Sequence, residues 1–130
     1  MLQGSNPFSQ LTELSLFINN IAKLPTNLSF AQLKVLNLNR NQELSTLHLG
    51  FCPLLEQLAV ASCNLNEIGH LKGCPQLTEL DVSFNHLPSL KALVDCLPHR
   101  NLTSLKFNDN LFSVIADQTA TYNQNAVSNL

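Results

Sequence analysis

The sequence predicts an α/β solenoid, a right-handed coil in which each turn contributes one short strand to a single parallel sheet. The first observation is a frame of the form L-x-x-L-x-[LVF]-x-x-[NC], which begins at residues 11, 33, 55, 77 and 102. The second observation is the spacing of these starts, because a regular period of about 20–50 residues is typical of solenoids. We therefore expect five repeats over residues 11–115.

The first half of each repeat predicts a strand with one buried face. Leucine, valine or phenylalanine occupies positions 4 and 6, whereas positions 3, 5 and 7 are variable. Alternation with a period of two residues indicates a half-buried strand. Strands that recur once per turn lie parallel and are joined by right-handed crossovers. The expected result is a five-stranded parallel sheet.

Position 9 follows each strand and is asparagine in four of the five repeats. An asparagine amide can donate to and accept from the backbone of neighbouring turns, and so satisfy polar groups that the loop leaves unpaired. Cysteine offers only a weak S–H donor, so we expect a weak point in the third repeat. The predicted ladder comprises Asn19, Asn41, Cys63, Asn85 and Asn110.

The second half of each repeat predicts 3-10 turns or short helices on the opposite side of the coil. Apolar residues recur there every three residues, as in Leu65, Ile68 and Leu71, and this spacing suits a 3-10 turn. Extra residues at 95–100 lengthen the fourth repeat and predict a helix over residues 89–97. A shifted copy of the frame at residues 44–54 predicts an extended second half of that repeat, with room for a small strand at residues 47–49.

The two ends of the chain are expected to lie outside the five repeats. Residues 1–10 match the end of a preceding repeat or an N-terminal extension, because Phe8 lies 22 residues before Phe30. Residues 116–130 are mostly polar and predict a tail or the start of a further repeat. Since terminal repeats of a solenoid need a cap, we expect the chain to be part of a longer solenoid.

The amino-acid composition argues for a folded module, and against nucleic acid and membranes as its partners. Hydrophobic residues make up 45% of the chain and charged residues 12%, which indicates a packed core. A net charge of −2, with scattered lysines and arginines, argues against nucleic acid as a partner. The sequence shows neither a secretory signal nor an apolar run of about 18 residues, so we expect no membrane partner.

No pattern predicts catalysis, a cofactor or a metal site. Cys96 and His99 could in principle act as a nucleophile and its base, but Cys96 matches a core position. Glu79 and Asp81 share one strand face, yet the sequence supplies no third oxygen ligand for a cation. The chain also lacks a glycine-rich phosphate loop. We therefore expect no enzyme activity, no cofactor and no small-molecule substrate.

The four cysteines are expected to be buried, reduced thiols. Cys52, Cys74 and Cys96 recur at the 22-residue period, and Phe8 and Phe30 occupy the same position in earlier turns. A position that accepts Phe or Cys is a core position, where free Cys packs as a small hydrophobe. Disulfides and a metal site are the alternatives, since stacked positions lie about 4.8 Å apart. Reduced cysteines favour an intracellular location, and we expect the cytoplasm.

The stretch from Phe8 to Ile115 resembles the 22-residue subclass of leucine-rich repeats, L-x-x-L-x-L-x-x-N-x-[IL]-x-x-[IL]-x-x-L, and residues 77–93 are its cleanest copy. The regulatory subunit of type-1 protein phosphatase typifies this subclass, which also includes an axonemal dynein light chain and other ciliary and cytoskeletal proteins. The resemblance implies a horseshoe with its five strands on the concave face. It further implies a non-enzymatic scaffold that binds another protein there, within a larger intracellular complex.

Two other roles stay open. One is a structural component of a ciliary, cytoskeletal or other large assembly. The other is a secreted or cell-surface ligand-recognition domain, which the glycosylation sequons at Asn27 and Asn101 favour.

The expected partner-binding residues lie at positions 3, 5 and 7, because side chains at these positions point away from the core. Phe17 is the one large apolar side chain among them and is the expected anchor. Asp81 and Lys106 are expected to pair across adjacent strands. The full set is Glu13, Ser15, Phe17, Val35, Asn37, Asn39, Gln57, Ala59, Ala61, Glu79, Asp81, Ser83, Ser104, Lys106 and Asn108.

Overall fold

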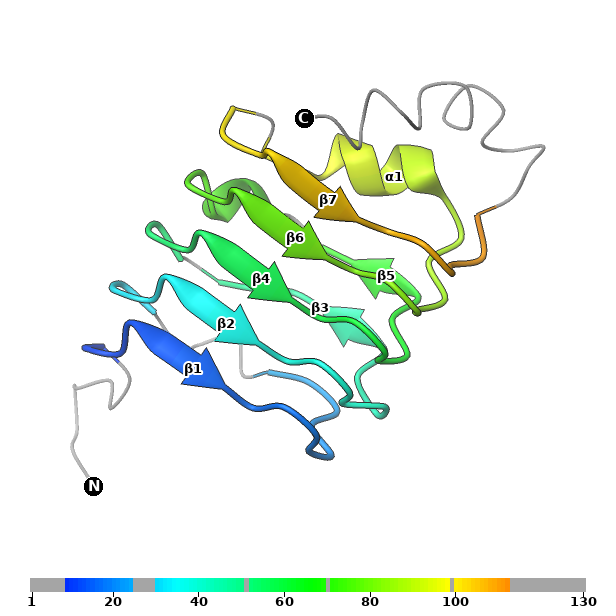
Figure 1. The fold of residues 1–130 in the computed structure, drawn as a ribbon, viewed down its shortest axis with the longest axis horizontal. Coiled ribbons are helices and arrows are strands. Elements are labelled where there is room, and N and C mark those ends of the chain that lie inside the picture. Colours follow the sequence, from blue (N-terminus) through cyan, green and yellow to red (C-terminus); the bar gives the residue numbers. More distant parts are fainter. Residues whose placement is uncertain (1–8, 25–29, 51, 70, 99, 113–130) are drawn as a thin grey trace.

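The computed structural model describes residues 9–24, 30–50, 52–69, 71–98 and 100–112. The expectations for residues 1–8 and 116–130, for Asn27 and for His99 lie outside the described residues. The described part of the chain coils into a solenoid around one five-stranded parallel sheet (Figure 1). In spatial order the strands are β1 (Glu13–Ser15), β2 (Val35–Asn37), β4 (Gln57–Ala59), β6 (Glu79–Asp81) and β7 (Ser104–Lys106).

The register of the sheet follows the period of the sequence. Glu13, Val35, Gln57, Glu79 and Ser104 are successive partners across the sheet, and each occupies position 3 of its repeat. The longer fourth repeat keeps this register, so its extra residues lie outside the sheet. The five strands form four successive parallel pairs, one between each two neighbouring turns of the coil. The predicted parallel-strand solenoid is thus confirmed.

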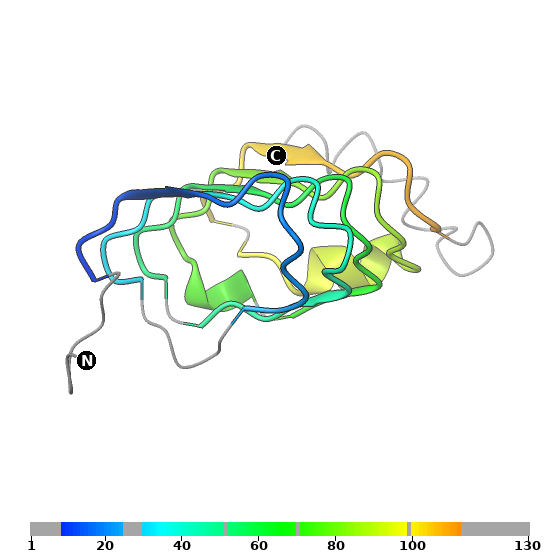
Figure 2. The same cartoon turned by 90° about the horizontal axis from the view of Figure 1, so that it is seen from below.

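The layer opposite the sheet contains little helix. β3 (Thr46–Leu47) and β5 (Glu67–Ile68) pair in parallel to form a second, two-stranded sheet. Two helices occur in the described residues, the 3-10 helix η1 (Leu71–Gly73) and the α-helix α1 (Leu90–Asp95). Figure 2 shows both helices on the side away from the five-stranded sheet.

Strands replace the expected 3-10 turns in part of this second layer. The small strand expected at residues 47–49 lies at Thr46–Leu47, and its partner β5 was expected to be a 3-10 turn. The backbone N–H of Gly69 donates to Leu47 O at 2.7 Å, so each turn satisfies its backbone groups through its neighbour. A parallel ladder between turns therefore takes the place of hydrogen bonds within each turn.

Helix α1 is shorter than the predicted span of residues 89–97. Ser89 is its N-cap and accepts a hydrogen bond from Ala92 N at 3.1 Å, and Cys96 is its C-cap. This placement leaves Cys96 half-buried, whereas Leu97 is fully buried. The expectation that Cys96 fills the core position of the other cysteines was therefore wrong, because the helix displaces it.

The core is a set of stacked leucine columns between the two layers. Leu36, Leu58 and Leu80 occupy position 4 of successive strands and are at most 2% exposed. The equivalent residue of the first turn, Leu14, is only half-buried. Burial of apolar side chains is the main stabilising term of such a fold, so the middle turns contribute more stability than the first.

The residue at position 8 of every repeat adopts a left-handed backbone conformation. This turn follows each strand, and the sequence reasoning missed it because no glycine occupies the position. The five residues are Ile18, Arg40, Ser62, Phe84 and Asp109, with φ between 52° and 64°. Left-handed backbone is unfavourable for L-residues and most unfavourable for β-branched ones, whereas asparagine tolerates it.

Relief of this strain should be measurable at Ile18, whose side chain is 56% exposed. We expect Ile18→Asn to raise the free energy of unfolding by about 1 kcal/mol, since little apolar burial is lost while the β-branched residue leaves a left-handed position. Urea denaturation followed by circular dichroism measures this change. Ile18→Val keeps the branching and should give no gain. Destabilisation by the asparagine would contradict the interpretation.

Candidate functional site

One face of the five-stranded sheet is covered by no described element. The second layer packs against the opposite face, as Figure 2 shows. We call the uncovered side the open face, and define it by the residues at positions 3 and 5 of β1, β2, β4, β6 and β7. Since the strands keep one register, these side chains form two parallel rows across the sheet.

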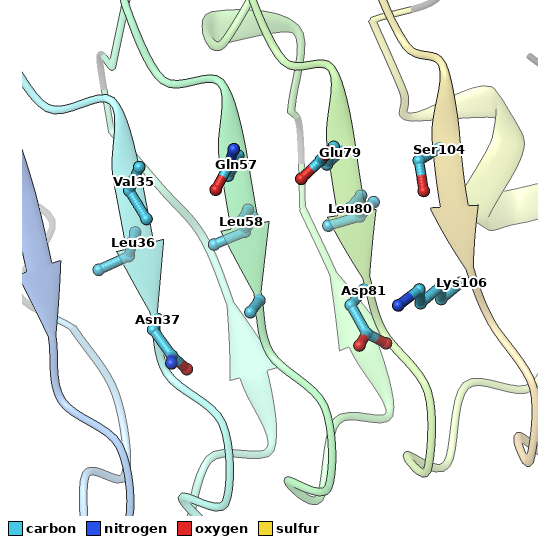
Figure 3. Close-up of a pocket in the computed structure, with 11 residues that line it drawn as sticks. Val35, Leu36, Asn37, Gln57, Leu58, Glu79, Leu80, Asp81, Ser104 and Lys106 are labelled. Carbon is cyan, nitrogen blue, oxygen red and sulfur yellow. The ribbon is translucent and has the colours of Figure 1, made fainter.

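A shallow depression of about 310 Å³ lies in the open face and spans four strands. Figure 3 shows that polar side chains from neighbouring strands surround it. It brings together the expected binding residues of β2, β4, β6 and β7, whereas those of β1 lie outside its lining. The lining residues are Val35, Leu36, Asn37, Gln57, Leu58, Ala59, Glu79, Leu80, Asp81, Ser104 and Lys106.

The expected binding residues differ in how far they reach solvent. Glu13, Ser15, Phe17, Gln57, Glu79, Lys106 and Asn108 are exposed. Val35, Asn37, Asn39, Ala59, Ala61, Asp81 and Ser104 are half-buried. Ser83 is buried at 4% exposure, which contradicts its expected place on the surface. Its hydroxyl donates to Oδ1 of Asn108, the position-7 residue of the next turn, at 2.8 Å, so a hydrogen bond between turns takes the place of contact with solvent.

The expected ion pair between Asp81 and Lys106 does not form. The two residues are partners on β6 and β7, and the Lys106 amino group points toward Asp81 (Figure 3). However, the ion pairs between described residues are those of His48 with Glu67 and of Lys91 with Asp95. Asp81 Oδ1 instead accepts a hydrogen bond from the backbone N–H of Ser83 at 3.0 Å. A local turn therefore fixes the carboxylate and leaves its charge available to a partner.

The asparagine at position 9 of the second, fourth and fifth repeats connects its turn to the preceding one. Asn85 Nδ2 donates to Val60 O at 2.9 Å and to Val82 O at 3.0 Å, and Asn85 Oδ1 accepts from Leu65 N at 3.0 Å. Asn85 Nδ2 also lies 3.2 Å from Ser83 O, so the amide contacts four backbone groups at a buried position. Asn41 and Asn110 repeat this pattern. Asn19 is exposed and bonds only to Leu16 O and Phe17 O, within its own turn.

Cys63 reproduces only the donor half of this pattern. Its Sγ donates to Leu38 O at 3.3 Å and to Ala61 O at 3.6 Å. No hydrogen bond between described residues joins the thiol to Glu43 N, which corresponds to Leu65 N in the Asn85 pattern. Burial raises the pKa of the Cys63 thiol and outweighs backbone hydrogen bonds of Asn41 and Arg40 that lower it, so the thiol stays protonated and keeps its weak donor.

All four cysteines lie in the described part of the chain and are free thiols. Cys52 and Cys74 are fully buried in neighbouring turns. A hydrogen bond from the Cys74 thiol to Cys52 raises the pKa of Cys74 and lowers that of Cys52, and burial raises the pKa of Cys74 further. The two thiols are therefore buried in the core and hydrogen-bonded to each other.

Large apolar side chains line the loops that directly follow the strands, and the sequence reasoning found only one of them. We call positions 7–10 of the five repeats the rim. Four large hydrophobic side chains of the described residues are exposed, and every one belongs to the rim. They are Phe17, Ile18, Phe84 and Leu111, with exposures of 45%, 56%, 56% and 62%. The missed signal was an apolar residue at a position where the repeat frame requires none.

Comparison with protein-family models and with curated proteins finds no match to this chain. Within the described ranges, no cluster of three or more His, Cys, Asp or Glu side chains is arranged to hold a metal ion. The longest helix there is α1 with six residues, and none is long and apolar enough to cross a membrane.

Proposed function

We propose that this chain is a non-enzymatic scaffold of the leucine-rich repeat type, which binds a partner protein on the open face of its sheet. In this proposal the open face is the concave side of a horseshoe, and the repeats belong to the 22-residue subclass. The register of the strands, the buried leucine columns and the asparagine hydrogen bonds between turns support this assignment.

The observation that carries the proposal is the depression across β2, β4, β6 and β7. A sheet face that no described element covers, hollowed and lined by both polar and apolar groups, suits a protruding segment of another protein. Ala59, at its centre, leaves room for such a segment. Its charged lining residues are Glu79, Asp81 and Lys106, and no His or Cys lines it, so a nucleophile with a His base does not meet there.

An intracellular site of action is part of the proposal. Four free thiols, three of them buried, suit a reducing compartment. The sequon at Asn101 gives limited support to a secreted role, because Asn101 Nδ2 donates to Pro75 O at 3.0 Å and is the atom that a glycan would modify. The proposed partner is a protein, within a cytoplasmic or cytoskeletal assembly.

Site-specific photo-cross-linking in native lysate tests the proposed surface. A photoreactive amino acid at Gln57, in the depression, should form a discrete covalent adduct with one protein. The same amino acid at Lys72, an exposed position of η1 on the other layer, is the matched control and should not form this adduct. Ala59→Arg fills the depression and should abolish the Gln57 adduct, while circular dichroism shows an unchanged fold. An adduct that persists in Ala59→Arg would disprove binding in the depression.

A further inference from the structure

The rim contributes an exposed aromatic side chain close along the chain to the depression. Phe84 lies three residues after Asp81, and Asp81 lines the depression at the end of β6. Phe84 is 56% exposed, although its backbone is held in place by a hydrogen bond from its N–H to Asn108 O at 2.9 Å. A fixed backbone that presents a large apolar side chain to solvent is organised for contact before any partner arrives.

The fold does not require phenylalanine at this position. Residue 84 adopts a left-handed conformation with φ of 57°, and other repeats place isoleucine, arginine, serine or aspartate there. A bulky exposed residue in this conformation costs stability and contributes little burial in return. The aromatic side chain is therefore better explained by contact with a partner than by packing within the chain.

The charge of the depression indicates what kind of segment complements it. Glu79 and Asp81 supply two carboxylates, and Lys106 supplies one amino group, so the lining carries a net charge of −1. Asp81 uses one oxygen for Ser83 N, and no hydrogen bond or ion pair between described residues engages its second oxygen or the Glu79 carboxylate. An incoming cation would restore charge balance at this surface, and an incoming carboxylate would meet repulsion.

We propose that Phe84 and the depression form one docking surface for a protein segment in which a basic residue and a large apolar residue lie close together. The basic residue binds at Glu79 and Asp81, and the apolar residue packs on Phe84. Phe84 follows Asp81 by three residues, which is at most about 10 Å of chain, so the two partner residues lie within about three positions of each other in an extended segment. Arginine suits the acidic position better than lysine, because its planar group can bond two carboxylates and stack on an aromatic ring.

This inference rests on the proposed function and needs a test that separates the two. The probe is a library of random ten-residue peptides displayed on phage and selected on the whole chain. Enriched peptides are synthesised with a fluorescent label, and their affinity is measured by fluorescence anisotropy. We expect enrichment of peptides with arginine or lysine about three positions from an aromatic or large aliphatic residue.

Two pairs of variants then assign the contacts. Asp81→Asn keeps an oxygen for Ser83 N but loses the charge, and Phe84→Asn removes the ring while relieving the left-handed strain. Each should weaken binding about tenfold or more, the usual effect of losing an interface anchor. The controls are Glu43→Gln, an equal loss of charge at an exposed position off the sheet, and Ile18→Asn, the same change at position 8 three turns away. Both controls should bind as the unchanged chain does.

The outcomes distinguish the inference from the proposed function. Ala59→Arg, which fills the depression, identifies the peptides that bind there, because such peptides should bind this variant more weakly than the unchanged chain. One outcome is that these peptides lose affinity for Ala59→Arg but bind Asp81→Asn and Phe84→Asn as tightly as the unchanged chain. That result would overturn the inference and leave the proposed function intact. Both proposals fail if the enriched peptides bind Ala59→Arg with the same affinity as the unchanged chain. They also fail if selection on the unchanged chain enriches no peptide beyond those that selection on Ala59→Arg enriches.

Discussion

Replacing Leu80 with alanine will lower the free energy of unfolding by about 3–4 kcal/mol. Leu80 is the middle residue of β6, its side chain is 1% exposed, and Leu58 and Leu105 lie beside it on the neighbouring strands. Truncation removes most of the side chain and leaves a cavity, because strands held on both sides cannot close around the gap. Domains of this size are stable by about 5–15 kcal/mol, so the loss is a large share of the total.

Leu14→Ala is the matched control for this prediction. Leu14 occupies the same position in β1, but it is half-buried, and among the described strands only β2 lies beside it. We expect a loss of about 1–2 kcal/mol there, because less apolar surface returns to water. Urea denaturation followed by circular dichroism gives both values. Equal losses at the two positions would refute the view that the middle turns supply most of the stability.

The strands of the large sheet were predictable because one constraint acts on every turn. A parallel ladder requires each strand to sit beside the same residues of its neighbour, so the 22-residue period of Leu36, Leu58 and Leu80 determines both strand and register. The longer fourth repeat did not disturb this reasoning. Its extra residues are accommodated around helix α1, outside the sheet.

The second layer was less predictable because its apolar spacing suits more than one conformation. Leu65, Ile68 and Leu71 are spaced for a 3-10 turn, yet Ile68 belongs to strand β5 and Leu71 begins η1. The choice depends on whether backbone groups bond within a turn or to the next turn. Here Asn66 N donates to Ser45 O at 2.9 Å, a contact between turns that residue spacing does not encode.

The open face was predictable in outline, and local hydrogen bonds decided its details. Alternation along each strand correctly placed Gln57 and Glu79 toward solvent. It failed for Ser83, whose buried hydroxyl bonds to Asn108 of the next turn and not to solvent. Alternation also does not decide whether Asp81 pairs with Lys106, and in the structure Asp81 Oδ1 accepts a hydrogen bond from Ser83 N within its own turn.

The second large effect is expected at Asn85, where alanine should lower the free energy of unfolding by about 3 kcal/mol or more. Asn85 is 3% exposed, and its amide bonds to Val60 O, Val82 O and Leu65 N. Alanine leaves these backbone groups without their partner in a space that water does not readily enter. Each unsatisfied buried group costs about 1–3 kcal/mol, so the loss should exceed that of an ordinary surface substitution several-fold.

Asn19→Ala removes the equivalent residue at the exposed end of the ladder. Water can replace the bonds of Asn19 to Leu16 O and Phe17 O, so we expect a loss below about 1 kcal/mol. Asn85→Asp is the sharper variant, because it keeps an acceptor for Leu65 N but turns a carboxylate oxygen toward the carbonyl of Val60. At neutral pH it should destabilise the chain at least as much as alanine does. A small loss for both Asn85 variants in thermal denaturation would show that the turns are held together by leucine packing alone.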